Sequence, residues 1–271
     1  MLVTADGVKV DFSCGVFKNG EQRIKLLGNV NGARCVVVES MAPNPDEKLV
    51  RILLTVDALK ENGARAVELF MPWMGYSLQN RHFDGEAVSS RVVARAISGS
   101  GADSVSVVDV HSDACLSYFT IPVKNISSAP VFSRYMQREQ QQYTVVAPDA
   151  GSRGRVEDLA KLVNAPAAYL SKMRDEETLD VSGFTLLEGT LGETCVLVDD
   201  AVNSGRTVVG VSRWLRSQGV KRVVWCVTHF LGVSESLELI LPEVDLLVTT
   251  DSVENGLKTE GKIVVLPLEL P

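Results

Sequence analysis

The segment 196–207 combines residue types that can hold a phosphorylated sugar. Three apolar, β-favouring residues lead into two adjacent carboxylates, Asp199 and Asp200, and a polar turn at 203–205 then opens a predicted helix. Backbone N–H groups of such a turn, together with the helix N-terminus, attract a phosphate group. The two carboxylates can accept hydrogen bonds from vicinal hydroxyl groups. The segment predicts a sugar-phosphate site in which Asp200, as a loop carboxylate, binds ligand and contributes little to fold stability.

A second turn, at 148–155, carries the carboxylate of Asp149 at its start and then Gly151 and Gly154, before another predicted helix. The amides of such a turn can cradle a diphosphate. Asp149 can hold a magnesium ion there, because Mg²⁺ prefers carboxylate and phosphate oxygens. Turns rich in Asp and Gly are common, so this segment does not define a site by itself.

Two polar groups in the first half of the chain also follow predicted strands. His111 lies just past the strand predicted at 105–109, where a histidine can bind a metal, act as an acid or base, or occupy a structural position. Arg81 lies in the polar segment 76–86, where it can pair with a phosphate or remain in a solvated loop. Spacing alone leaves these alternatives open.

Two cations, Lys172 and Arg174, follow the strand predicted at 167–170. Cations at a strand end can neutralise the charge that develops during phosphoryl transfer. The alternative interpretation is an exposed charge cluster. The acidic segment 175–180 that comes next is predicted to be a mobile loop.

Strand-like and helix-like segments alternate along the chain, which indicates an α/β fold with parallel sheets covered on both faces. Ligands of such sheets bind beyond the carboxyl ends of the strands, which is why the residues after each strand are the candidates. Three helix-to-strand connectors contain a glycine suited to a left-handed helix cap, at Gly63, Gly101 and Gly219. The predicted strands include 35–39, 66–71, 105–109, 143–147, 167–170, 196–198 and 222–227.

A polar, turn-prone stretch at 123–130 divides the chain into two halves. Each half is long enough for one α/β unit, and a helix predicted at 131–140 opens the second half. We therefore predict two domains, residues 1–127 and residues 128–271.

Composition argues against several classes of partner. Apolar residues make up 45% and charged residues 23% of the 271 residues, as in a globular protein. With a net charge of -7 and a pI of about 5.1, the chain shows no extended basic face, so no nucleic acid is expected as a partner.

No apolar run reaches the roughly 18 residues of a membrane span, and the N-terminus lacks a signal-peptide pattern. The five cysteines are widely spaced, so we expect reduced thiols in a cytoplasmic protein.

Six segments resemble, in the same order, motifs of the ribose-phosphate diphosphokinase family, whose members make phosphoribosyl pyrophosphate (PRPP). In the first half, residues 17–21 resemble the family's Phe-x-Asp-Gly-Glu segment, residues 76–81 resemble its Tyr-x-Arg-Gln-Asp-Arg segment, and residues 109–111 resemble its Asp-Leu-His motif. In the second half, residues 148–155 resemble its pyrophosphate loop, and Lys172 with Arg174 resembles the Lys-Arg-Arg of its flexible catalytic loop. Residues 196–207 resemble its PRPP-binding signature. Each match alone is modest, but six in one order are difficult to obtain by chance. The resemblance extends from Phe17 to about residue 255.

This resemblance implies both a fold and a reaction. The fold is α/β, with two tandem type I phosphoribosyltransferase-like domains, each a mostly parallel sheet flanked by helices. ATP is expected on the side of residues 1–127 and ribose 5-phosphate on the side of residues 128–271. The reaction is the Mg²⁺-dependent transfer of the β,γ-diphosphoryl group of ATP to the C1 hydroxyl of ribose 5-phosphate, which gives PRPP and AMP. A homo-oligomer, either a dimer or a hexamer, is also implied.

The resemblance assigns a role to each matching residue. Ribose 5-phosphate is bound by Asp199, Asp200, Asn203, Ser204, Gly205 and Thr207. ATP is bound by Phe17, Asn19, Glu21, Gln79 and Arg81, the first three of which contact adenine from a neighbouring subunit in the family. The catalytic residues are Lys172, Arg174 and His111, and the metal is positioned by His111 and Asp149.

Several positions depart from the family's motifs. They are Asn19 in place of an acid, Leu78 in place of an Arg, Ser152 in place of a Gly, Asn203 in place of an Asp and Arg206 in place of a Gly. The departures at positions 19 and 78 leave the nucleotide preference open. Two alternatives are therefore kept: a non-catalytic regulatory homologue that binds nucleotide or sugar phosphate, and a type I phosphoribosyltransferase that consumes PRPP.

Overall fold

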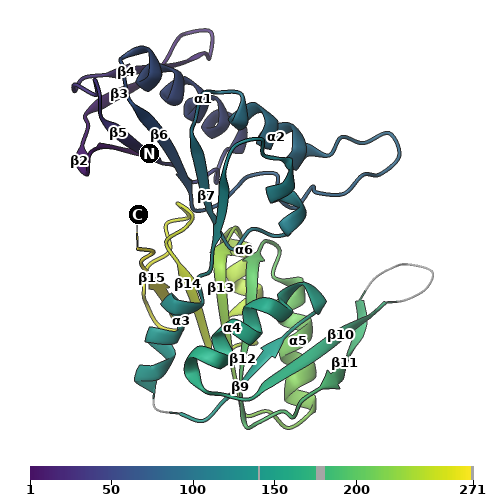
Figure 1. Ribbon diagram of the computed structural model, residues 1–271. Helices are drawn as coiled ribbons and strands as arrows, with labels where there is room; N and C mark the ends of the chain where they lie inside the picture. Colours follow the sequence, from purple (N-terminus) through teal and green to yellow (C-terminus); the bar gives the residue numbers. More distant parts are fainter. Residues whose placement is uncertain (140, 175–180, 270–271) are drawn as a thin grey trace. The chain divides into compact units, whose positions relative to one another are not determined.

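The structure is a computed structural model that describes residues 1–139, 141–174 and 181–269 (Figure 1). The chain divides into two compact units, of which the first is Met1–Ile126 and the second begins at Ser127. Each unit contains a mostly parallel sheet with flanking helices, which confirms the predicted α/β class.

The first unit is built on a sheet with the order β2-β1-β5-β6-β7-β8. Neighbouring strands from β5 to β8 are parallel, whereas β1 is antiparallel to both β2 and β5. The strands are β1 (Leu2–Ala5), β2 (Val8–Lys9), β5 (Arg34–Val38), β6 (Ala66–Met71), β7 (Ser104–Val108) and β8 (Val123–Ile126). A separate hairpin consists of β3 (Phe12–Val16) and β4 (Gln22–Leu26).

Local sequence explains the helices of this unit. Helix α1 (Pro45–Glu61) begins with a proline in its first turn and buries Ile52, Val56 and Leu59 on one face. The next helix is α2 (Ser89–Ser98), and a short 3₁₀ helix, η1 (Asp113–Tyr118), follows β7. Gly63, Gly101 and Gly219 all have a positive φ, which confirms the predicted left-handed caps in both units.

The second unit has a sheet with the order β11-β10-β9-β12-β13-β14-β15. All neighbouring strands are parallel except the pair β10–β11. The strands are β9 (Thr144–Ala147), β10 (Ala167–Arg174), β11 (Val181–Glu188), β12 (Thr194–Val202), β13 (Arg222–Phe230), β14 (Leu246–Thr250) and β15 (Ile263–Leu266). The α-helices are α3 (Ala129–Met136), α4 (Arg153–Val163), α5 (Arg206–Ser217) and α6 (Ser234–Ile240), and the 3₁₀ helices are η2 (Gln137–Glu139) and η3 (Ala150–Ser152).

Strand β12 shows how this sheet is covered on both faces. Val196 and Val198 pack with residues of α3 and α4, whereas Leu197 packs with residues of α5 and α6. Successive side chains of a strand point to opposite faces, so one buried strand supplies two cores. The sequence predicted this double coverage from the alternation of strands and helices.

The second unit corrects two expectations. The strand predicted at 167–170 continues to Arg174, so Lys172 lies within β10 and not beyond its end. Its partner β11 was not predicted; the two strands pair antiparallel, with Lys172 opposite Phe184. The acidic segment 175–180, expected to be a mobile loop, lies outside the described residues.

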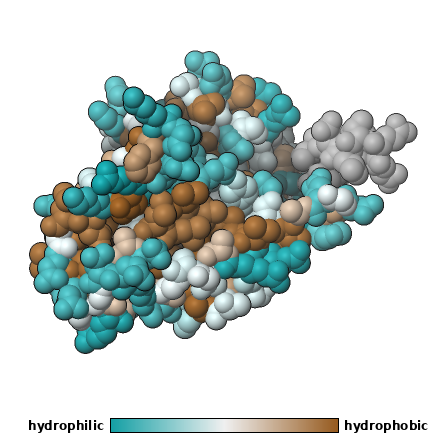
Figure 2. All heavy atoms as spheres, turned by 90° about the horizontal axis from the view of Figure 1, so that it is seen from above, coloured by the Kyte–Doolittle hydropathy of each residue, from teal (hydrophilic) through white to brown (hydrophobic). Residues whose placement is uncertain are grey.

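Figure 2 shows the exposed surface coloured by hydropathy, with hydrophobic side chains gathered in one area of the view between hydrophilic ones. No helix in the part of the chain that the structure describes is long and apolar enough to span a bilayer. The exposed large hydrophobic side chains of the first unit include Val8, Val16, Phe17, Leu27, Leu78 and Phe83.

Candidate functional site

Strand order in the second unit reverses at β9, which lies between β10 and β12. The chain leaves β9 through α4 to reach β10 on one side, and later returns to β12 on the other side of β9. In open α/β sheets, ligands bind beyond the carboxyl ends of strands at such a reversal of strand order. Asp149 follows β9, and Asp199 and Asp200 lie near the carboxyl end of β12. All three carboxylates therefore lie near the carboxyl ends of the strands that adjoin this reversal.

The two carboxylates of β12 are held by an arginine from α4. One terminal nitrogen of Arg155 is 2.5 Å from Oδ1 of Asp200 and 4.0 Å from Oδ1 of Asp199. The N–H of Asp200 donates to Oδ1 of Asp199 at 3.0 Å. Asp200 is 3% exposed. The expectation that it is a loop carboxylate without a structural role is therefore wrong, because it is a buried, paired residue of a central strand.

Asp199 lies in an environment that disfavours its charged form. Burial raises the pKa of Asp199 well above its usual range, and the negative charges of Asp200 and Asp149 raise it further, while Arg155 opposes the shift. The carboxyl oxygens of the acidic pair can accept hydrogen bonds from hydroxyl groups.

The turn after β9 is stabilised by a reciprocal cap. Oδ1 of Asp149 accepts a hydrogen bond from the N–H of Gly151 at 3.0 Å, and the hydroxyl of Ser152 donates to the carbonyl of Asp149 at 2.9 Å. Ser152 is fully buried. Its departure from the family's glycine therefore has a structural use, since its hydroxyl closes the turn.

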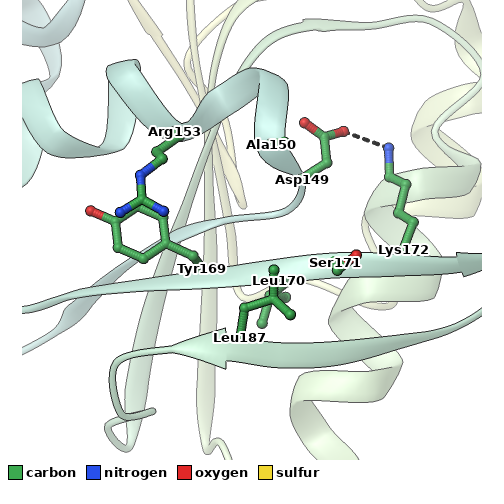
Figure 3. Close-up of a pocket in the computed structure, with 8 residues that line it drawn as sticks. All are labelled: Asp149, Ala150, Arg153, Tyr169, Leu170, Ser171, Lys172 and Leu187. Atoms are coloured by element: carbon green, nitrogen blue, oxygen red, sulfur yellow. Dashed lines mark hydrogen bonds and ion pairs between the residues drawn. The ribbon is translucent and has the colours of Figure 1, made fainter.

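Asp149 also pairs with the cation on β10. The Lys172 ammonium is 2.6 Å from Oδ2 of Asp149, and the two side chains point toward one another (Figure 3). A pocket of about 280 Å³ lies beside this pair. On its other side the guanidinium of Arg153 lies 4.0 Å from the centre of the Tyr169 ring. The pocket is lined by Asp149, Ala150, Arg153, Tyr169, Leu170, Ser171, Lys172 and Leu187.

The turn after β12 is supported by helix α6. Gly205 has a φ of 78°, and a side chain there would approach the Ile240 side chain to 2.7 Å. The Ser236 hydroxyl donates to the carbonyl of Asn203 at 2.8 Å. This leaves Asn203 and Ser204 exposed, with Thr207 half-buried in the first turn of α5. A rigid turn with exposed polar residues at a helix N-terminus suits a phosphate group.

In the first unit, His111 is exposed and lies just past β7. The backbone before it is fixed by the next strand. The N–H of Asp109, a residue with a φ of 38°, donates to the carbonyl of Ile126 at 3.0 Å, and the N–H of Val110 donates to Oδ1 of Asn125 at 3.1 Å. These bonds hold the turn that presents His111.

The segment after β6 carries Gln79 and Arg81, both exposed. Oε1 of Gln79 accepts a hydrogen bond from the hydroxyl of Ser89 at 2.7 Å, and its carbonyl accepts one from the N–H of Ser90 at 3.2 Å. The segment is thereby attached to the start of α2.

The turn between β3 and β4 carries Phe17, Asn19 and Glu21. Oδ1 of Asn19 accepts a hydrogen bond from the N–H of Glu21 at 3.3 Å. The ring of Phe17 is 51% exposed, and the Arg23 guanidinium lies 6.0 Å from its centre. The turn thus presents an aromatic ring to its surroundings.

Comparisons with known proteins agree with these features. Residues 7–101 match the family described as the N-terminal domain of ribose phosphate pyrophosphokinase, and residues 129–265 match the phosphoribosyl transferase domain. The ribose-phosphate pyrophosphokinase of Methanopyrus kandleri is 36% identical over 251 residues, which cover 88% of this chain and 82% of the relative. That of Sulfolobus acidocaldarius is 32% identical over 255 residues, which cover 93% and 87%.

The chain belongs to the ribose-phosphate pyrophosphokinase family. A crystal structure of phosphoribosylpyrophosphate synthetase from Mycobacterium smegmatis aligns with a TM-score of 0.84 at 25% identity, and the alignment covers 95% of this chain and 86% of that one. The family, the enzyme class and the two-domain phosphoribosyltransferase-like architecture inferred from the sequence are therefore confirmed.

In this pyrophosphokinase-family chain, the second unit brings Asp149, Lys172 and the acidic pair to one sheet edge. Arg174 is the last residue of β10. Arg155, which the sequence interpretation left without a role, joins this group through Asp200. The sequence could have indicated Arg155 as a site residue, because it lies in the first turn of the helix that follows the diphosphate turn.

Metal binding must be judged from the donor atoms. Among the residues that the structure describes, no group of three or more His, Cys, Asp or Glu side chains could hold a metal ion. Mg²⁺ is commonly held by one or two carboxylates together with substrate phosphates and water. The single half-buried carboxylate of Asp149, beside an amide-rich turn, fits that mode of binding.

Proposed function

We propose that the protein transfers the β,γ-diphosphoryl group of ATP to the C1 hydroxyl of ribose 5-phosphate, which gives PRPP and AMP. The observation that carries this proposal is the pairing of charges at the reversal of strand order in the second unit. There, Lys172 contacts Asp149, and Arg155 contacts Asp200. Membership in the ribose-phosphate pyrophosphokinase family supports the same reaction.

The sugar phosphate binds along the end of β12. Asp199 and Asp200 bind the ribose hydroxyls, because neighbouring carboxylate oxygens can accept hydrogen bonds from vicinal hydroxyl groups. The 5-phosphate binds the turn at 203–205 and Thr207, where the N-terminus of the 12-residue helix α5 supplies unpaired N–H groups. Support from α6 keeps this turn preorganised.

The C1 hydroxyl oxygen attacks the β-phosphorus of ATP, the bond between that phosphorus and the oxygen bridging to the α-phosphorus breaks, and AMP leaves. The hydroxyl proton is released to water in the same transfer. Such a reaction depends mainly on positioning and on neutralising charge. Lys172 supplies positive charge next to the diphosphate turn, and we assign the same role to Arg174, the last residue of β10. Mg²⁺, held by Asp149 together with phosphate oxygens, adds charge neutralisation when bound.

The first unit supplies the nucleotide side. Gln79, Arg81 and His111 contact the ATP phosphates, and His111 also helps to position the metal. The turn that carries Phe17, Asn19 and Glu21 contacts adenine of a neighbouring copy. The exposed ring of Phe17 supports this role, since an exposed aromatic on a hairpin turn is available for stacking. The proposed assembly is a homo-oligomer, either a dimer or a hexamer.

The test is to incubate purified protein with ATP, ribose 5-phosphate and Mg²⁺ and to measure AMP and PRPP. We expect AMP release that depends on the sugar, with a reaction that lacks ribose 5-phosphate as the control. Consumption of PRPP with a nucleobase would indicate a phosphoribosyltransferase instead. Nucleotide or sugar binding without turnover would indicate a regulatory homologue.

A further inference from the structure

Arg155 contacts both carboxylates of the acidic pair. We propose that it is a binding residue of the sugar subsite, which sets the orientation of the Asp200 carboxylate and also donates a hydrogen bond to the bound sugar phosphate. This inference rests on the proposed function, since it takes ribose 5-phosphate to bind at Asp199 and Asp200.

The contact between Arg155 and Asp200 is short and largely buried. The Arg155 side chain is 16% exposed and the Asp200 side chain 4% exposed, and the shortest distance between their charged groups is 2.5 Å. Asp199 is further away, at 4.0 Å. A guanidinium is a planar group with donors in fixed directions, so it restricts the orientation of a carboxylate more than an ammonium does.

The backbone that carries Arg155 is anchored on both sides. Arg155 lies in the first turn of α4, and the next residue, Val156, is fully buried in the core beneath that helix. Residue 152, just before the helix, is also fully buried and caps the turn at Asp149. The backbone on both sides of Arg155 is therefore anchored, and its side chain has a defined direction toward β12.

The guanidinium of Arg155 also carries a buried hydrogen-bond donor, Nε, that no described residue accepts from. A buried donor without an acceptor is unfavourable, and proteins keep such groups mainly where a ligand or a functional constraint requires them. This donor sits on the same planar group that binds Asp200. We assign it to an oxygen of the bound substrate.

A structural ion pair without a role in binding is the competing explanation. The pair between Arg216 and Asp245 in the same unit offers a matched control, because its shortest distance is also 2.5 Å. Arg216 lies in the last turn of α5, whereas the sugar-phosphate turn precedes the first turn of that helix. Loss of Arg216 therefore removes an ion pair without touching the proposed subsite.

The experiment measures ribose 5-phosphate binding by calorimetry for the wild type, Arg155→Met, Arg155→Lys and Arg216→Met, with melting temperatures recorded for each. We expect Arg155→Met to raise the Kd for the sugar by about 10- to 100-fold, the range that follows from losing a charged hydrogen bond. Arg155→Lys should give an intermediate Kd, because it restores the charge without the planar geometry. Arg216→Met should leave the Kd unchanged, whatever its melting temperature.

Equal Kd values for Arg155→Lys, Arg216→Met and the wild type would overturn the inference, and Arg155→Lys keeps the test decisive if Arg155→Met does not fold. A double-mutant cycle with Asp200→Asn should show that the two losses are not additive. Additive losses would also overturn it. Failure of the wild type to bind ribose 5-phosphate would instead count against the proposed function and would remove the basis of this inference with it.

Discussion

In the second unit, charged side chains from several elements pair with one another, whereas in the first unit the candidate residues lie on separate turns. Asp149 and Lys172 come from the β9 turn and β10, and Arg155 and Asp200 come from α4 and β12. The side-chain hydrogen bonds of Gln79 and Asn19, by contrast, link residues at most 10 positions apart. In the second unit the site's own side chains pair across distant elements. In the first unit distant residues hold the backbone of the candidate segments, as at Val110 and Asn80.

Strand order explains this difference. In the second unit β9 lies between β10 and β12, so the chain reverses direction across the sheet at β9. In the first unit the parallel strands β5 to β8 follow one another in sequence order, and no such reversal occurs among them. Because crevices form where strand order reverses, two units of one architecture need not carry two equivalent sites.

The largest expected effect tests the tertiary assembly of the second unit. Lys172→Ala should lower kcat by about 10²- to 10³-fold, by analogy with the loss of one preorganised donor to a transition state. The Kd for ribose 5-phosphate should change little, because this cation is proposed to act mainly in the transition state. Steady-state kinetics and calorimetry separate the two effects, with Lys161→Ala, an exposed lysine of α4, as the control. Equal losses in kcat and in sugar affinity would contradict this role.

A second prediction addresses the burial of the acidic pair. Asp200→Asn leaves the Arg155 guanidinium, 16% exposed, without its nearest charged partner. Breaking a buried ion pair from one side costs about 3 kcal/mol, so the free energy of unfolding should fall by that order. The control is Glu193→Gln, which breaks an exposed pair with Lys221 and should cost about 1 kcal/mol or less. Denaturant titration measures the loss in the free energy of unfolding for both variants. Equal losses would mean that Asp200 stabilises the fold no more than an exposed ion pair does.

The sequence predicted the placement of these carboxylates near strand ends because the relevant information is local. A β-branched run followed by Asp199 and Asp200, and another followed by Asp149, place carboxylates near strand ends in any parallel sheet. The glycines at helix ends were predicted equally well, since a positive φ is a property of one residue.

Contacts between distant segments were not predictable in the same way. Arg155 and Asp200 are 45 positions apart, and their pairing depends on how α4 packs against the sheet. Strand β11 was missed because its partner β10 was itself taken to end at residue 170. Ser152 was interpreted only as a departure from a glycine, since its capping hydrogen bond is visible only in three dimensions.

A third prediction uses the unusual titration of the acidic pair. Burial and neighbouring negative charges raise the pKa of Asp199 in the folded protein above its value of about 3.9 in the unfolded chain. At a pH between the pKa of Asp199 in the unfolded chain and its pKa in the folded protein, the folded state binds more protons than the unfolded state. The free energy of unfolding therefore falls as pH rises through this range. Asp199→Asn removes this dependence. The melting temperature of the variant, relative to the wild type, should therefore increase as pH rises above about 4, and a pH-independent difference would contradict the shift. Asp158→Asn, at an exposed position of α4, is the control.

The smallest expected effect tests the local stabilisation of the first unit. Ser89→Ala removes the hydroxyl that donates to Oε1 of Gln79 at 2.7 Å. A neutral hydrogen bond at an exposed position contributes about 1 kcal/mol, so the KM for ATP should rise by about threefold to fivefold. The Kd for ribose 5-phosphate should not change, because the proposed sugar subsite lies wholly on the second unit. Ser117→Ala, which removes a hydroxyl that donates to the Ala114 carbonyl, should leave both constants unchanged. A change in sugar affinity in Ser89→Ala would show that the two sites are coupled, and the contrast drawn between the units would then fail.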